Sequence, residues 1–380
     1  MKALSRHERL VRAARGQEVD RVPALGGWIN GARNLAELAG ISVAEYLADR
    51  AAAVVRANLA LDADGMVSPI VPKDVEEVRT GHVVDEDHAG TEAEDLLKFA
   101  QGLPESEADV LRAEGFDAAA EETQLRRYFD TARRQWGGIE PIPNFWTIGG
   151  PFPLYHRFGY LAFFEACVLY PEAVGRIWWT WSLTARRRAE ILVKLYRELD
   201  LGPVMFCGED LCNNQGPMVS PQMLRQHYFP VVKAIIAPLV EAGVRLVHHC
   251  DGDVRPLVRD FLDMGFSGFQ GFQYEVGVDP VELRKLRSAR GEEPILLAGM
   301  SVSRTLPFGT PAEVCDEVKY LFDVTEGGRG MFLFTANVIG VEVPVANTRA
   351  GYAFVKTLDP ATWRPAGRPV WPWQIQHPGT

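Results

Sequence analysis

The chain has 380 residues, 47% hydrophobic and 24% charged, and its 40 Lys and Arg against 50 Asp and Glu give a formal charge of −10 at pH 7. A net acidic surface does not attract nucleic acid or an anionic membrane, so neither is expected as the main partner. No apolar run approaches about 18 residues, no signal peptide is evident, and five scattered cysteines make no disulfide framework, so we expect a cytoplasmic protein without a transmembrane helix.

The first predicted elements lie before residue 80. Residues 5–15 predict a short amphipathic helix, because Ser5 and Glu8 form a capping box and Gly16 follows the apolar pattern. Strands are expected at residues 22–25, just before Gly26-Gly27, and at residues 65–71. Between them, residues 43–61 are rich in Ala, Leu and Val and predict one long helix.

Residues 80–140 differ in composition from the rest of the chain. They are acidic and rich in alanine, with acidic runs at Asp85-Glu86-Asp87 and at residues 92–95, and with a helical pattern near residues 105–120. Charge runs of this kind are typical of a solvated surface segment. We therefore predict an α-rich insertion into the main fold, with a lid as the alternative.

From residue 141 onward, predicted strands alternate with predicted helices. The strand candidates are residues 143–148, 203–208, 244–250, 268–272, 295–300 and 331–335. The helix candidates are residues 161–169, 171–199, 221–242, 254–264, 280–289 and 311–322. With the two N-terminal strands these make eight strand–helix units, which favour a barrel over a doubly wound sheet. We expect an α/β fold, a (β/α)8 TIM barrel over residues 1–358 with an N-terminal helix and the insertion at about 80–140.

The last residues, 359–380, form a Pro- and Trp-rich tail that contains Trp363 and the run Trp371-Pro372-Trp373. This composition predicts an extended segment docked on a protein surface. A homodimer contact is one use that such a segment has.

Polar residues gather where the predicted strands end. The carboxyl ends of the strands carry the functional residues in a barrel, so these side chains are expected at one face. They are Trp28, Asn30, Trp146, Cys207, Glu209, Asp210, His248, His249, Cys250, Asp251, Gln270, Gln273, Met300, Ser301, Thr335 and Asn337.

The run His248-His249-Cys250-Asp251 is the most informative of these ends. Side chains alternate along a strand, so His248 shares a side with Cys250, and His249 shares the other side with Asp251. Either pair can supply two metal ligands, and packed core residues are the structural alternative. Upstream, Arg245 and Val247 suit a barrel interior, which favours His249 and Asp251 as the pair that faces the site.

Aromatic residues also lie near the strand ends. Trp28 and Trp146 are expected to line a pocket for a flat apolar substrate. The tryptophans of residues 178–181 have the spacing of one packed helix face and are predicted to lie in the core.

Several short motifs together resemble the uroporphyrinogen decarboxylase superfamily, which also contains corrinoid-linked methyltransferases. The similar stretches run along nearly the full length and keep their order, although no single one is specific. They are residues 9–23, Gly149-Gly150-Pro151-Phe152, Glu209-Asp210, residues 216–221, residues 249–254, Asp279-Pro280, Gly299-Met300, residues 309–311 and residues 344–347. The resemblance implies a (β/α)8 barrel with its site at the carboxyl ends of the strands.

The resemblance is nearest to members that demethylate methoxylated compounds. The arginine-rich signature of the tetrapyrrole decarboxylases is missing, since residues 26–32 read Gly-Gly-Trp-Ile-Asn-Gly-Ala. The two zinc cysteines of the thiol-methylating members fall at Asp251 and near Asn337, so a thiol substrate is not expected. The likeness therefore implies removal of methyl from a small methoxylated, aromatic substrate and its delivery to a corrinoid protein.

The same likeness assigns roles to the residues at the strand ends. Zinc is expected on His249, Asp251 and Glu209 or Cys207, with Cys250 and His248 as alternative ligands. Asp210 and Asn337 are the expected catalytic residues. Trp28, Asn30, Trp146, Gln273 and Met300 are expected to bind the substrate.

Two other functions stay open at the level of the sequence. One is a metal-free decarboxylase or other lyase, in which Asp210 or Asp251 stabilises a protonated pyrrole or iminium. The other is a binding or assembly protein without catalysis. Acidic residues and histidines at the strand ends argue against the latter, because buried charges are costly to keep.

Overall fold

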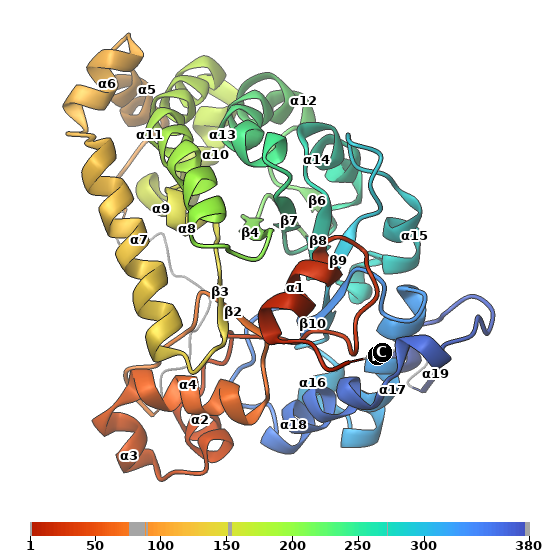
Figure 1. Ribbon diagram of the computed structural model, residues 1–380. Helices are drawn as coiled ribbons and strands as arrows, with labels where there is room; N and C mark the ends of the chain where they lie inside the picture. The colour runs from red at the N-terminus through yellow and green to blue at the C-terminus, as the bar shows by residue number, and fades with distance from the viewer. Residues whose placement is uncertain (1, 76–87, 89, 151–153, 272, 377–380) are drawn as a thin grey trace.

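The computed structural model describes residues 2–75, 88, 90–150, 154–271 and 273–376 (Figure 1). The predicted acidic run Asp85-Glu86-Asp87, the Pro151-Phe152 part of one family motif, and Phe272 at the end of a predicted strand lie outside the described residues.

Two parallel sheets form the centre of the molecule. The first has the order β1-β2-β3 and the second the order β10-β9-β8-β7-β4. Their strands are β1 (Leu25–Gly26), β2 (Gly65–Val67), β3 (Glu140–Ile142), β4 (Val204–Gly208), β7 (Arg245–His249), β8 (Gly268–Gln270), β9 (Ile295–Met300) and β10 (Met331–Thr335). Single parallel bridges join the sheets at both edges, from Asn144 to Phe206 and from Ala24 to Leu333. A small antiparallel hairpin, β5 (Cys212–Asn213) and β6 (Gly216–Pro217), follows β4.

Helices surround these sheets (Figure 1). Those before β4 are α1 (Arg6–Ala14), α2 (Ala32–Ala39), α3 (Val43–Ala48), α4 (Arg50–Ala60), α5 (Ala93–Gln101), α6 (Glu107–Ala113), α7 (Ala118–Gln135), α8 (Phe145–Ile148), α9 (Tyr155–Phe158), α10 (Tyr160–Leu169) and α11 (Pro171–Glu198). Those after it are α12 (Pro221–Met223), the π-turn η2 (Leu224–Tyr228), α13 (Phe229–Glu241), η3 (Arg255–Leu257), α14 (Val258–Met264), η4 (Tyr274–Val276), α15 (Pro280–Lys285), α16 (Thr305–Phe308), α17 (Pro311–Val324), α18 (Val345–Phe354), η5 (Val355–Thr357), η6 (Pro360–Thr362) and α19 (Pro372–Gln376). In the described part of the chain, none of these helices combines the length and the apolar character that a membrane crossing needs.

Helix α1 lies across the amino ends of the strands, in front of β8, β9 and β10 in Figure 1. Its apolar side chains and one face of the strands share a core of Leu10, Ala13, Ala14, Val204, Phe206, Val247, Leu297, Phe332 and Phe334. Arg245, the first residue of β7, donates to the carbonyl oxygens of Ala14 and Ser267 at 2.9 Å each. The Arg245 guanidinium, the charge predicted on the interior face, is therefore hydrogen-bonded beneath α1 at the amino ends of the strands. A functional site is thus expected at the opposite, carboxyl ends of the strands.

Most of the predicted elements are confirmed. Helix α1 has its predicted capping box, with the Ser5 side chain accepting from the Glu8 amide, and β9 and β10 have the predicted bounds. The predicted long helix breaks at Asp49, whose carboxylate accepts from the Ala52 amide and begins α4. Helix α2 was not anticipated, because its residues follow Gly31 without a polar capping side chain.

The strand predicted at residues 143–148 is wrong. Strand β3 ends at Ile142, and Phe145–Ile148 forms the short helix α8. The reason is local, since the Asn144 side chain accepts from the Thr147 amide while the Thr147 hydroxyl accepts from the Asn144 amide. This reciprocal cap satisfies the free amides of a helix start and outweighs the apolar strand pattern.

The segment between β2 and β3 contains α5, α6 and α7 in its described part. Its acidic side chains pair with bases of α11, as Glu121 does with Arg188 at 2.7 Å and Glu122 with Lys194 at 2.8 Å. Acidic residues of α7 thus contact the helical layer of the main fold, on the left of Figure 1.

The tail packs on the chain's own surface. The Trp371 ring stacks on Tyr274 with centroids 4.6 Å apart, and Trp371 and Trp373 are both buried. Docking is confirmed, although the segment ends in the short helix α19 and not in an extended form. A homodimer stays a prediction, and these two tryptophans have partners within their own chain.

A buried carboxyl of α17 gives the stability of the fold a predictable dependence on pH. Glu317 is buried, accepts from the Ser301 amide at 3.0 Å, and burial raises the pKa of its carboxyl to about 7. In the unfolded chain the same group titrates near 4.5. The folded protein therefore holds the extra proton between these values, and stability falls as the pH rises from about 4.5 to about 7, by about 3 kcal/mol from this group.

The variant Glu317→Gln keeps the shape of the side chain and removes its titration. Urea denaturation at several pH values between 4.5 and 8 should show the variant gaining stability relative to the natural chain as the pH rises. Parallel stability curves for the two proteins would contradict the expectation.

Candidate metal centre

Asp210, His249 and Asp251 come together at the carboxyl ends of β4 and β7. Alternation along β4 places Asp210 on the side of Phe206, and alternation along β7 places His249 and Asp251 on the side of Val247, both facing the interior core. Gly208 pairs with His249 across the strands, where a Cβ would lie 2.5 Å from the Cβ of His249. Only glycine at this position leaves room for the histidine.

The three side chains offer one ligand atom each, and these atoms lie within 4.8 Å of one another. The His249 Nε2 atom is 3.7 Å from an Asp210 oxygen and 3.9 Å from an Asp251 oxygen. The Asp251 amide donates to Asp210 at 3.0 Å and fixes that carboxylate against β7. Among the described residues, no other His, Cys, Asp or Glu side chains form such a group of three or more.

Gln270, at the end of β8, determines which nitrogen of His249 carries a proton. Its side-chain nitrogen donates to the carbonyl oxygens of Thr335 and Ala336, at 2.6 and 3.0 Å. Both partners can only accept, so the amide oxygen must be the atom that faces His249 Nδ1, 2.5 Å away. In the neutral ring Nδ1 therefore carries the hydrogen, and the Nε2 lone pair faces two carboxylates.

A lone pair directed at two carboxylates is electrostatically unfavourable without a cation between them. Burial raises the pKa of the Asp251 carboxyl, which is a second sign that negative charge is costly there. Imidazole nitrogen and carboxylate oxygen are ligands that zinc accepts, and three protein ligands leave a position open for a substrate. The donor set and its tautomer thus fit a catalytic zinc ion.

Other predicted residues support or border this group. Asn337 donates its side-chain amide to Asp251, and Gln273 accepts from the Gly252 amide in the loop after β7. The Trp28 ring meets the His249 ring edge to face, with centroids 5.6 Å apart. These contacts hold the ligands in place and give the site one aromatic wall.

The other predicted ligands, Glu209 or Cys207 and the alternatives Cys250 and His248, face the helical layer. The His248 ring stacks on Phe261 of α14 at 3.7 Å and is buried. Cys207 and Cys250 are buried in the core between strands and helices, where burial raises the pKa of the Cys207 thiol. Glu209 is buried on the same side, and burial raises the pKa of its carboxyl to about 8 against a hydrogen bond from Tyr228. None of the four belongs to the group of three.

Three predicted substrate residues lie elsewhere. Trp146 is 70% exposed and lines a depression with Tyr128 and Asn144 that the metal group does not line. Met300 packs in the helical layer, where its sulfur lies 2.4 Å from the position of a Cβ on Gly351 of α18. Asn30 is buried, and its backbone N–H donates to the Ile339 carbonyl oxygen at 2.9 Å.

Gln270 has no predicted role, and Asp210 is predicted as a catalytic residue and not among the metal ligands. A signal for Asp210 was present, because it follows β4 with the parity of the interior residues. No signal identified Gln270 as the partner of His249, since its role depends on two carbonyl groups that lie 65 and 66 residues away.

Comparison with known proteins identifies a shared fold. No protein-family model matches the chain, and no curated protein sequence is detectably similar. Among solved structures it resembles a methyltransferase from Methanosarcina mazei, with a TM-score of 0.57 and 17% sequence identity. The likeness covers 93% of this chain and 99% of that chain, so nearly the whole arrangement of strands and helices is common to both.

Proposed function

We propose that the chain is a zinc-dependent methyltransferase of the uroporphyrinogen decarboxylase superfamily, built on a closed (β/α)8 barrel. It removes a methyl group from a small methoxylated aromatic substrate and passes it to a corrinoid protein. Eight parallel strands with bridges at both sheet edges support the barrel. The fold shared with a methyltransferase supports the class of reaction.

The orientation of His249 carries the proposal. Its Nε2 atom and the carboxylates of Asp210 and Asp251 converge at the carboxyl ends of the strands, where barrel enzymes keep their sites. Asp210 is the most exposed of the three, with a side chain 46% accessible, so a substrate approaches the group from its side.

The chain's own residues would bind the ion, hold its ligands in place and contact the substrate. His249, Asp210 and Asp251 hold the ion, Gln270 and Asn337 hold those ligands, and the Trp28 ring gives the substrate an apolar edge. When bound, zinc supplies a Lewis acid for the ether oxygen that loses its methyl group, and a corrinoid carried by the partner protein supplies a strong nucleophile. The aromatic wall excludes water from one side of the reacting atoms.

Metal content and methyl transfer test this function together. Protein purified without a histidine tag should contain about one zinc ion per chain by elemental analysis. A panel of methoxyarenes with free cob(I)alamin should yield methylcobalamin, measured by absorbance. Removing the metal with a chelator should abolish turnover, and zinc should restore it. Full activity of metal-free protein, or decarboxylation without any methyl transfer, would refute the proposal.

A further inference from the structure

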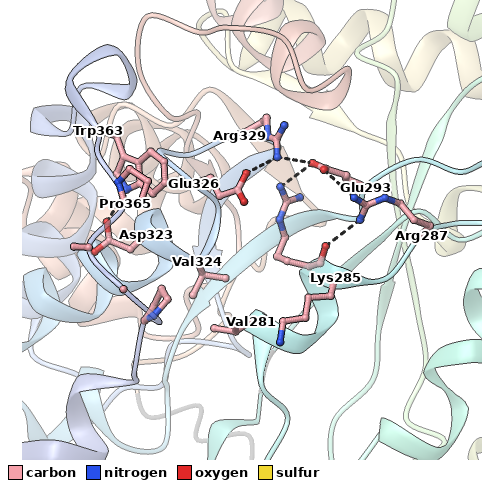
Figure 2. A pocket seen from close by; sticks show the side chains of 14 residues that line it. Val281, Lys285, Arg287, Glu293, Asp323, Val324, Glu326, Arg329, Trp363 and Pro365 are labelled. Atoms are coloured by element: carbon pink, nitrogen blue, oxygen red, sulfur yellow. Dashed lines mark hydrogen bonds and ion pairs between the residues drawn. The ribbon is translucent and has the colours of Figure 1, made fainter.

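A second cavity lies at the amino ends of β9 and β10, on the face opposite the metal group (Figure 2). It has a volume of about 430 Å³, within the range of small-molecule sites. Residues of α15, α17, the loops before β9 and β10, and the tail surround it. Those that matter for binding are Arg284, Arg287, Glu293, Glu326, Arg329 and Trp363.

Positive charge is in excess on one side of this cavity. Glu293 pairs with three guanidinium groups, those of Arg284 at 3.2 Å, Arg287 at 3.1 Å and Arg329 at 3.0 Å. Figure 2 labels Glu293 with Arg287 and Arg329. Glu326 pairs with Arg329 as well. Three positive charges thus meet two negative ones, in a chain whose formal charge is −10.

Arg284 is the most enclosed of the three arginines. Its side chain is only 8% exposed, and its guanidinium also donates to the Pro294 carbonyl. Burial lowers the pKa of this group, and the charges of Arg329 and Arg287 act in the same direction. Arg284 is thus held in place by Glu293 and Pro294, while Arg287 and Arg329 are the more exposed guanidinium groups of the cluster.

The opposite side of the cavity carries an aromatic ring and apolar side chains beside the Asp323 carboxylate. The Trp363 side chain is fixed by a hydrogen bond from its Nε1 to Asp323 at 2.9 Å, and Val324 and Pro365 extend the same wall. In Figure 2 this wall and the arginines lie on opposite sides of the space. A ligand with a flat apolar part and an anionic group matches both sides.

We propose that this cavity binds a small organic anion, a ring that carries a carboxylate or a phosphate. The anionic oxygens bind Arg287 and Arg329 beside Glu293, and the ring lies against Trp363. Guanidinium groups suit both anions, because their N–H groups can donate in pairs to two oxygens. The site is separate from the metal centre and does not depend on the proposed methyl transfer.

Isothermal titration calorimetry of the full chain with phenyl phosphate, benzoate and inorganic phosphate tests the proposal. At least one of the two aromatic anions should bind, and more tightly than inorganic phosphate. Arg329→Gln, at a side chain 46% exposed, should weaken binding about tenfold. Arg259→Gln is the matched control, since this arginine pairs with Asp263 and neither residue lines the cavity, and it should leave binding unchanged.

Glu293→Gln distinguishes a binding site from a purely structural ion-pair network. Removing this carboxylate raises the local positive charge, so the aromatic anion should bind more tightly, while loss of a structural network would lower the melting temperature without any gain in affinity. Binding should persist in His249→Ala, which separates this site from the metal centre. The proposal fails if neither aromatic anion binds, or if Glu293→Gln binds it no more tightly than the natural chain.

Discussion

His249→Ala is expected to lose zinc, whereas the neighbouring His248→Ala is expected to keep it. His249 supplies a ligand nitrogen between Asp210 and Asp251, while His248 is stacked on Phe261 in the helical layer. Loss of a direct ligand should weaken zinc binding by more than about 100-fold, because loss of a supporting residue alone costs about 10–100-fold. Methyl transfer should fall with the bound metal.

The two variants should also differ in stability. Here His248→Ala, which keeps the metal, should be the more destabilised of the two. His248→Ala removes a buried ring and leaves a cavity, which should cost about 3 kcal/mol in urea denaturation. His249→Ala should cost less without zinc, since it relieves the contact of the ring with two carboxylates. If His248→Ala loses the metal and His249→Ala retains it, the assignment of the ligands is wrong.

Gln270→Ala should weaken zinc binding about 10–100-fold without removing any ligand. The amide of Gln270 holds the hydrogen on Nδ1 of His249 and so keeps Nε2 available. Without it the ring can change tautomer or rotate, and a larger share of molecules presents an N–H to the ion. Competition with a zinc chelator of known affinity measures the effect.

Gln273→Ala is the matched control for this prediction. Gln273 lies in the loop after β8 and accepts from the Gly252 amide, with no hydrogen bond to His249. Its loss should change zinc affinity less than the loss of Gln270 does. Equal effects of the two variants would indicate a general loosening of the loops and not a role in setting the tautomer.

Features that depend on local periodicity could be predicted from the sequence. Alternation along residues 244–250 separates His248 from His249, because successive side chains of a strand point to opposite faces. The same rule explains why Cys207 and Glu209 face the helices, while Phe206 and Asp210 face the interior. It also puts Met300 on the helical side, which the expectation of a substrate contact overlooked.

Features that depend on competing local signals or on long-range contacts could not be predicted in this way. The helix at Phe145–Ile148 follows from the cap at Asn144, and that cap competes with an apolar strand pattern of similar strength. The support of His249 by Gln270 depends on where the end of β10 lies. Neither spacing nor composition carries that information, because the packing of the two sheets and their loops sets it.

The contacts of Gln270 also have a consequence for the order in which the protein matures. The ligands belong to residues 210–251, whereas the carbonyl groups that orient Gln270, and the Asn337 amide that holds Asp251, belong to residues 335–337. During synthesis on the ribosome, the three ligand residues emerge before residues 335–337, which hold Gln270 and Asp251 in place. If the chain binds zinc as proposed, we expect high-affinity uptake to follow synthesis of β10, and a chain interrupted before residue 335 to bind the ion only weakly although it contains all three ligands.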